Sequence, residues 1–116
     1  MPVDKAIQKF QKELNAGAIS LVLLSVIQQH GEPMYGYEIG NELESRCHGL
    51  LPMNLGAIYP VLRSLEWQAL LRSQMMPSNS GPPRKYYQLT EQGKAVLHEW
   101  TSVWASTTSF VNSILE

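Results

Sequence analysis

A helical spacing that passes directly into a strand spacing constrains the fold of this chain more than any other feature. Between residues 55 and 69 apolar side chains recur every three or four positions, which predicts a helix. Residues 70–76 and 84–90 are predicted to be strands, because the segment between them is rich in glycine, proline and serine. A helix that leads straight into a β-hairpin is typical of a small α+β domain. The predicted apolar face of the helix consists of Ile58, Leu62, Leu65 and Ala69.

Helical patterns flank this unit on both sides. Residues 4–29, residues 34–46 and residues 91–115 each carry apolar side chains at helical spacing. Asn54 is placed to cap the helix that follows it, and Thr90 is placed to cap the last helix. No repeat or change of composition marks a second domain, and 116 residues are enough for one modest core. We therefore expect one mostly α (α+β) structural unit.

The formal net charge of −1 hides an uneven distribution of charge. Residues 1–44 carry three cations and six acids, whereas residues 45–94 carry six cations and two acids. Charge asymmetry of this kind indicates which part of a chain faces a polyanion. We therefore expect any nucleic-acid-binding surface to lie within residues 45–94.

Cysteine content and apolar segments predict a cytoplasmic protein. Cys47 is the single cysteine, which excludes a disulfide framework within one chain and suits a reducing compartment. The N-terminal residues lack the basic, apolar and small-residue order of a signal peptide. Residues 16–27, the longest apolar stretch, are shorter than a membrane-spanning helix, so no membrane partner is expected.

The sequence carries no catalytic or cofactor signature. His30, His48 and His98 have no metal-ligand spacing with one another or with Cys47. A glycine-rich phosphate loop and a nucleophile elbow are also missing. We expect neither an enzyme nor a site for a metal or a cofactor.

The outward side of the helix over residues 55–69 has residue types suited to the DNA major groove. An α-helix fits this groove, where its outward side chains meet phosphates and base edges. The alternative is an ordinary solvated helix face. The candidate contacts on or before this helix are Asn54, Ala57, Tyr59, Pro60 and Arg63.

The predicted hairpin carries adjacent cations on its return strand. Arg84, Lys85 and Tyr86 follow the loop, and cations at such a place neutralise phosphates or enter a narrow minor groove. Strand alternation assigns Tyr87, together with Leu89, to the core instead. The alternative is a surface hairpin with two solvated charges.

The last helix carries an apolar seam with two tryptophans. The preceding helices already supply the core of a small domain, so packing of the seam against a second copy is the simplest explanation. A seam of this kind can also line a cavity for planar aromatic ligands, and Trp100 and Trp104 are candidates for either role. The seam consists of Leu97, Trp100, Trp104, Thr107, Val111 and Ile114, at alternating spacings of three and four.

Three stretches of the sequence, in this order, resemble the PadR family of transcriptional regulators. They are Met34-Tyr35-Gly36-Tyr37-Glu38-Ile39, then Gly56-Ala57-Ile58-Tyr59-Pro60-Val61-Leu62-Arg63-Ser64-Leu65-Glu66, then Gly81-Pro82-Pro83-Arg84-Lys85-Tyr86-Tyr87-Gln88-Leu89-Thr90-Glu91-Gln92-Gly93. With the intervening spacing, the resemblance covers about residues 18–97. The single C-terminal helix is similar to that of the short subfamily.

The resemblance implies a winged helix-turn-helix fold with a long N-terminal helix and a C-terminal dimerisation helix. Residues 1–90 would form the DNA-binding domain, and residues 91–116 the dimerisation helix of the same structural unit. It also implies a homodimer that acts as a repressor on a pseudo-palindromic double-stranded operator. A small planar aromatic or phenolic effector would relieve the repression.

The resemblance also implies an effector site midway along the last helix. Trp104 matches a tryptophan that stacks planar ligands in drug-responsive members of the family, and Trp100 precedes it by one turn. In the first helix, Gly17, Ser20 and Leu21 would line the same pore.

Three residues depart from the family pattern. Ala57 replaces a serine or threonine, so a hydroxyl donor to phosphate is lost, and Trp67 replaces a charged residue. Ala69 stands where a helix-ending glycine is usual. Because alanine in the left-handed conformation costs about 1–2 kcal/mol, we expect this helix to end differently.

Two functions remain open at this point. The first is a dimeric, sequence-specific DNA-binding transcriptional regulator. The alternative is a winged-helix protein-interaction module without DNA binding, anchored by Trp67.

Overall fold

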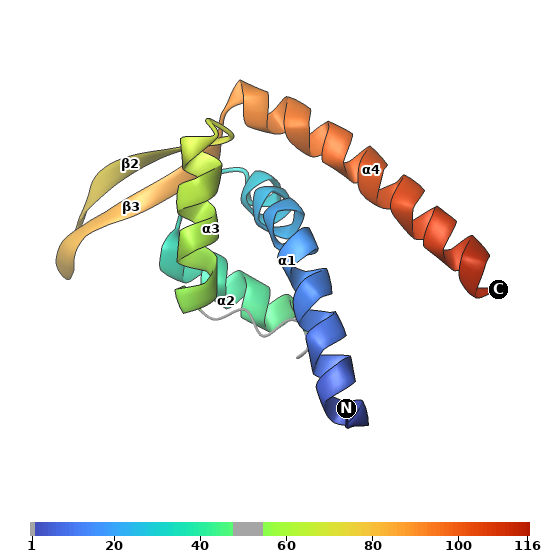
Figure 1. Ribbon diagram of the computed structural model, residues 1–116. Coiled ribbons are helices and arrows are strands. Elements are labelled where there is room, and N and C mark those ends of the chain that lie inside the picture. The colour runs from blue at the N-terminus through green and yellow to red at the C-terminus, as the bar shows by residue number, and fades with distance from the viewer. Residues whose placement is uncertain (1, 48–54) are drawn as a thin grey trace.

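The computed structural model describes residues 2–47 and 55–116, which form a helical body with a small sheet (Figure 1). The mostly helical fold confirms the predicted fold class. Its elements are α1 (Val3–His30), β1 (Met34–Tyr35), α2 (Gly36–Cys47), α3 (Leu55–Trp67), β2 (Leu71–Ser78), β3 (Gly81–Leu89) and α4 (Glu91–Leu115).

The core lies where the C-terminal half of α1 meets α2, α3, the sheet and the first turns of α4. Burying one leucine or isoleucine side chain in this core contributes about 1.5–3 kcal/mol to the stability of the fold before conformational entropy is subtracted. Leu97 of α4 is 5% exposed and belongs to this core, which ties the start of α4 to the body. The largest fully buried side chains are Leu23, Leu24, Ile39, Ile58, Leu62, Leu65 and Leu71.

The N-terminal half of α1 projects beyond this core. Its apolar residues Val3, Ile7 and Phe10 are 73%, 61% and 65% exposed. By length and composition α1 could cross a membrane, since its most apolar window has a mean hydropathy of 1.3. The sequence predicts that residues 16–27 are too short to span a membrane. The whole of α1, however, is long enough and apolar enough to do so. The C-terminal half of α1 packs into the core, but only 22% of its most apolar window is buried.

The sheet has three antiparallel strands in the order β1-β3-β2. The prediction of a helix over residues 34–46 is wrong at its first two residues, Met34 and Tyr35. They form β1, because their backbones pair with Tyr87 and Tyr86 of β3. The Glu38 carboxylate accepts a hydrogen bond from the Tyr35 N–H (3.1 Å), at the point where α2 begins.

The hairpin of β2 and β3 is longer than predicted. The expected loop over residues 77–83 shrinks to a turn at residues 79–80, with Ser78 paired to Gly81. Pro82 and Pro83 lie within β3 although proline lacks the N–H of a strand ladder. They are accommodated because, among the described residues, this outer part of β3 pairs with β2 alone and no strand pairs with its other edge.

α3 ends with a residue in the left-handed conformation. Ala69 has φ 62°; its N–H donates to the Glu66 carbonyl, and the Leu70 N–H donates to the Leu65 carbonyl, both at 2.9 Å. This is the Schellman pattern, and its apolar pair, Leu65 and Leu70, is buried. The expectation that alanine would make the helix end differently is therefore wrong. Ala69 also lies beyond the helix and is exposed, so its assignment to the apolar face is wrong.

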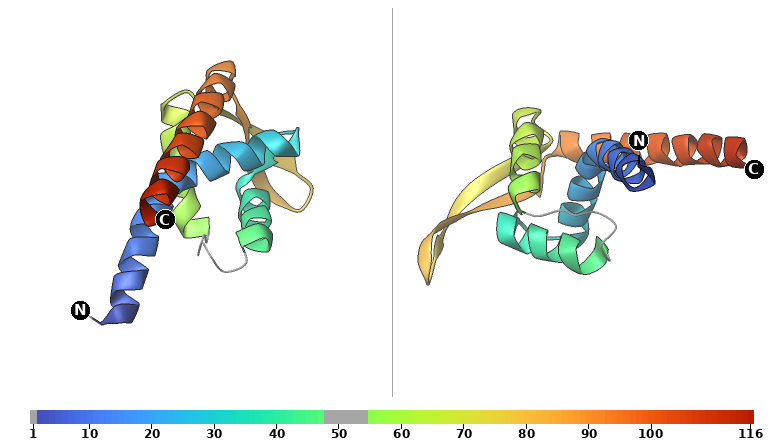
Figure 2. Two further views of the ribbon diagram at one scale, coloured as in Figure 1. Left: turned by 90° about the vertical axis from the view of Figure 1, so that its right-hand side faces the viewer. Right: turned by 60° about the horizontal axis from the view of Figure 1, so that its bottom comes forward.

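Thr90 joins the end of α3 to the start of α4. As predicted, it is an N-cap: its Oγ1 accepts from the Gly93 N–H at 2.9 Å. The same hydroxyl donates to the Ala69 carbonyl at 2.6 Å. A Cβ on Gly93 would lie 2.0 Å from the Leu70 carbonyl oxygen, so this close crossing requires glycine. From here α4 leaves the body as a projecting arm (Figure 2).

Candidate nucleic-acid interface

One side of α3 is buried and the opposite side is open to solvent. Ile58, Leu62 and Leu65 are 0% exposed, so their spacing fixes which side faces away from the core. Trp67 on the open side is 90% exposed. The exposed positions of α3 include Gly56, Ala57, Tyr59, Pro60, Arg63, Ser64 and Trp67, so four candidate contacts share this surface.

Tyr59 also has a structural role at the crossing of α2 and α3. It is 38% exposed, and a Cβ on Gly36 would lie 2.5 Å from its ring carbon Cε1. Gly36 therefore lets the tyrosine ring lie against the start of α2. The other candidate at this end of α3, Asn54, lies outside the described residues.

The cations of the wing, defined here as the β2–β3 hairpin, point to its two opposite faces. Lys85 and Tyr87 share the face that meets α3; Tyr87 is 3% exposed, which confirms its predicted place in the core. On the other face the Arg84 guanidinium lies 4.5 Å from the centre of the Tyr35 ring. The Tyr35 ring centre is in turn 5.4 Å from that of Tyr86, so Arg84 and Tyr86 share an aromatic cluster with β1.

A carboxylate of α3 binds both strands of the wing. Glu66 Oε1 lies 3.0 Å from Lys85 Nζ of β3, and Oε2 accepts a hydrogen bond from the Ser73 hydroxyl of β2. The Ser73 hydrogen bond, followed by Lys85, lowers the pKa of Glu66 from its ordinary 4.5 against the opposing effect of burial. The hydrogen bond to Glu66 is the largest cause that raises the pKa of Lys85. Both groups are therefore charged at neutral pH.

Sequence reasoning missed Glu66, Ser73 and Tyr35 as parts of this surface. The available signal was strand alternation, which places Lys85 on the same face as the core residue Tyr87 and hence toward α3. The identity of the acid that meets Lys85 follows only from the crossing of α3 over the hairpin.

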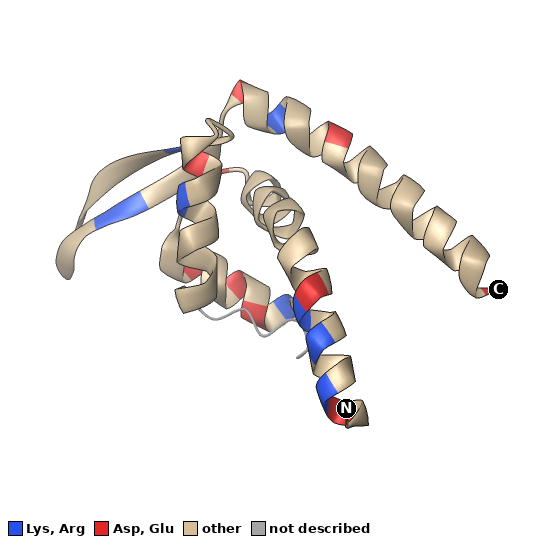
Figure 3. Ribbon diagram, viewed as in Figure 1, with Lys and Arg blue, Asp and Glu red and all other residues tan. Residues whose placement is uncertain are grey.

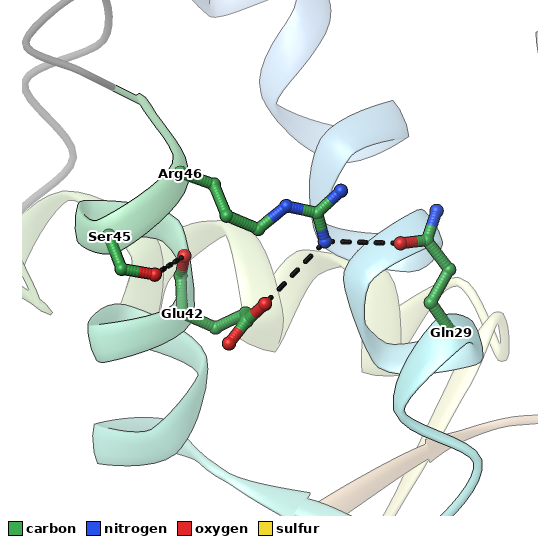
Figure 4. Close-up of polar contacts among 4 residues, drawn as sticks. All are labelled: Gln29, Glu42, Ser45 and Arg46. Atoms are coloured by element: carbon green, nitrogen blue, oxygen red, sulfur yellow. Dashed lines mark hydrogen bonds and ion pairs between the residues drawn. The ribbon is translucent and has the colours of Figure 1, made fainter.

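Ion pairs reduce the basic character that composition assigns to residues 45–94. Arg46 donates to Gln29 of α1 (3.1 Å) and lies 3.6 Å from the Glu42 carboxylate, so it braces α2 against α1 (Figure 4). Lys94 pairs with Glu91 at 3.1 Å. Basic positions lie on α3, β2 and β3, whereas a long stretch of α4 is uncharged (Figure 3). Among the described residues, the cations of this segment without a carboxylate partner are Arg63, Arg72 and Arg84.

The five predicted effector residues line one groove between α1 and α4. Its volume is about 540 Å³, and Trp104 also borders a second hollow of about 370 Å³ between α1 and α2. The walls of the first groove are largely apolar, which suits a flat aromatic molecule. The predicted residues in its lining are Gly17, Ser20, Leu21, Trp100 and Trp104.

The predicted seam of α4 divides into a buried start and an exposed remainder. Leu97 lies in the core of its own chain and Trp100 packs partly against that core, so neither is a freely exposed seam residue. Farther along, Trp104, Val111 and Ile114 are 46%, 44% and 68% exposed, and Thr107 is exposed as well. No charged residue occurs between Glu99 and Glu116. An exposed apolar surface of this length is typical of an interaction face.

Among the described residues, no group of three or more histidine, cysteine, aspartate or glutamate side chains is arranged to hold a metal ion. What the surface does provide is an open helix face beside a hairpin with cations. Helices in the order α2 and α3, followed by this hairpin, define a winged helix-turn-helix domain.

The chain belongs to the transcriptional regulator PadR-like family, and residues 23–99 match the sequence pattern of that family. A PadR family transcriptional regulator from Eggerthella lenta is 34% identical with a TM-score of 0.84, over 97% of this chain and 95% of that one. A PadR-like transcriptional regulator from Bacillus cereus is 32% identical with a TM-score of 0.74, over 90% and 97% of the two chains. These relatives are transcriptional regulators and not enzymes.

A third structure, Bacillus subtilis PadR in complex with operator DNA, is 21% identical with a TM-score of 0.65. The match covers 72% of this chain and 45% of that one, and it shows a shared fold.

Proposed function

We propose that the chain is a cytoplasmic, dimeric regulator that binds DNA in a sequence-specific manner and represses transcription. The observation that carries this proposal is the open face of α3 with Arg63, beside a wing whose Arg84 has no carboxylate partner among the described residues. Residues 1–90 would bind the DNA, and residues 91–116 would dimerise as part of the same structural unit. The operator complex of Bacillus subtilis PadR, which has the same fold, supports this use of the surface.

In this proposal α3 enters the major groove and the wing follows the phosphate backbone. Arg63 on the open face would meet a base edge or phosphate, with the neighbouring candidates of α3 beside it. Arg84 and Tyr86 would contact the backbone or the minor groove. Two copies would read half-sites about 34 Å apart on a pseudo-palindromic operator.

Dimerisation would cover the exposed, uncharged part of α4. This part of α4 includes the exposed residues Trp104, Val111 and Ile114. A second exposed apolar row lies on α1 and includes Ile7 and Phe10. A two-fold dimer buries the same stripe twice, so a modest surface per chain suffices. Sedimentation velocity at micromolar concentration should give a dimer, and Val111→Glu with Ile114→Glu should give a monomer.

A small planar aromatic or phenolic effector would occupy the groove beside Trp104 and weaken DNA binding. It can act only if it binds one arrangement of the two copies better than the other. Titration with a panel of planar aromatics should quench tryptophan fluorescence, and Trp104→Ala should abolish the saturable part. A panel without any saturable quenching would remove the effector from the proposal.

DNA binding is tested by fluorescence anisotropy with a duplex from the promoter region of the chain's own gene, at several salt concentrations. Arg63→Ala and Arg84→Ala should each weaken binding. Each cation that neutralises a phosphate should lower the salt slope by about 1 per copy, hence about 2 per dimer. Lys5→Ala, which removes the same charge from the exposed end of α1, is the control. Unchanged affinity and slope in both variants would refute this interface.

One observation favours a second candidate, a winged-helix protein-interaction module. Trp67 is 90% exposed on the open face of α3, and tryptophans of this kind anchor protein interfaces. A mobility-shift assay over the promoter region separates the two candidates. If the duplex is not retarded at low salt, the interaction module is the better explanation.

A further inference from the structure

We propose that Glu66 is a positioning residue that holds the wing at a fixed angle to α3, and that Lys85 binds Glu66 and not a DNA phosphate. The inference deepens the proposed function and rests on it, because the angle matters only if α3 and the wing grip one ligand together.

The wing needs such a brace because little of it is anchored in the core. Its buried side chains lie at the base, where Leu71, Tyr87 and Leu89 are 1%, 3% and 7% exposed. Toward the tip, Met75 and Met76 are 58% and 42% exposed. When a long hairpin is anchored only at its base, its direction depends on the contacts of the side chains between the base and the tip.

Glu66 occupies this position and uses both carboxylate oxygens. One oxygen lies 3.0 Å from Lys85 Nζ on β3, and the other accepts from the Ser73 hydroxyl on β2. A single side chain of α3 therefore binds both strands, which resists rotation of the hairpin as well as its displacement. Lys85 is held further by the Tyr87 ring, whose centre lies 5.4 Å from Nζ.

The same geometry gives Lys85 little freedom to reach DNA. Its side chain is 41% exposed, that of Glu66 is 31% exposed, and their charges neutralise each other. An acid on a polyanion-binding surface repels phosphate, so the charge of Glu66 by itself would weaken the attraction between this surface and DNA. Positioning and simple electrostatics therefore predict opposite signs when its charge is removed.

The decisive variant is Glu66→Gln, which keeps the shape of the side chain and removes one negative charge per copy. Positioning predicts that operator affinity falls about tenfold, the loss expected for one such ion pair in each of two copies. Electrostatics alone predicts tighter binding. Glu99→Gln removes the same charge from an exposed position of α4 and is the matched control, with affinity unchanged or slightly higher.

Two further measurements identify the contact itself. Lys85→Gln should weaken binding with an unchanged salt slope, whereas loss of a phosphate contact would lower the slope by about 2 per dimer. The double variant Glu66→Gln/Lys85→Gln should bind about as weakly as either single variant, because both remove the same contact.

Hydrogen exchange in the absence of DNA separates this proposal from the proposed function. Amides of β2 and β3 should exchange faster in Glu66→Gln and Lys85→Gln than in the wild type, while amides of the α1 core remain protected. Unchanged wing exchange, or tighter operator binding by Glu66→Gln, would overturn the proposal. Faster wing exchange in a protein that binds no duplex would instead refute the DNA-binding function and leave the brace intact.

Discussion

The substitution Ala69→Gly should stabilise this protein although it removes a methyl group and adds backbone freedom. Ala69 has φ 62°, a conformation that costs an L-residue with a Cβ about 1–2 kcal/mol and glycine almost nothing. The greater entropy of glycine in the unfolded chain offsets about 0.4–1 kcal/mol of this gain. The two bonds that define the turn, at 2.9 Å each, are made by backbone atoms and are retained. The net expectation is a gain of about 0.5–1 kcal/mol in the free energy of unfolding.

Urea and thermal unfolding at one fixed protein concentration measure this gain, because dimerisation would make the midpoint depend on concentration. The melting temperature should rise by a few degrees. Ala95→Gly is the control: Ala95 is an exposed residue within α4, where glycine costs about 1 kcal/mol. The same chemical change should thus have opposite signs at the two positions. Equal destabilisation by both variants would refute the claim that the backbone at Ala69 carries a conformational cost.

Three other perturbations have expected outcomes. Gly93→Ala places a Cβ 2.0 Å from a backbone oxygen that cannot move alone, so thermal unfolding should show a loss of about 2 kcal/mol or more. Thr90→Ala removes both the N-cap bond and the bond to the Ala69 carbonyl and should cost about 1–2 kcal/mol by urea unfolding; Thr101→Ala, inside α4, should cost much less. Folding lowers the pKa of Glu66, so its carboxylate contributes to the free energy of unfolding above the unfolded pKa near 4.5, and this contribution is lost as pH falls through the folded pKa. The difference in stability between the wild type and Glu66→Gln should therefore be constant near neutral pH and disappear in acid. A difference that grows in acid would contradict this assignment.

Much of the candidate site could be predicted from residue types at short spacing. Ile58, Leu62 and Leu65 are buried as their spacing predicts, which orients Arg63 and Trp67 toward solvent. Gly17 and Trp104, which the resemblance to the PadR family assigns to one effector site, line the same groove. What could not be predicted was which cations are already paired, because Lys85 meets an acid on a different element.

The sequence alone determined the properties that depend on neighbours along the chain. Helical and strand periodicity, the Thr90 cap and the core positions follow from side-chain spacing and from the requirement to bury apolar surface. The tertiary structure decided the properties that depend on distant partners. Met34 and Tyr35 became a strand because β3 satisfied their backbone groups, and Lys85 became paired because α3 brings Glu66 within 3.0 Å of it. Contacts between distant residues form only when the whole fold brings them together, and local patterns do not encode them.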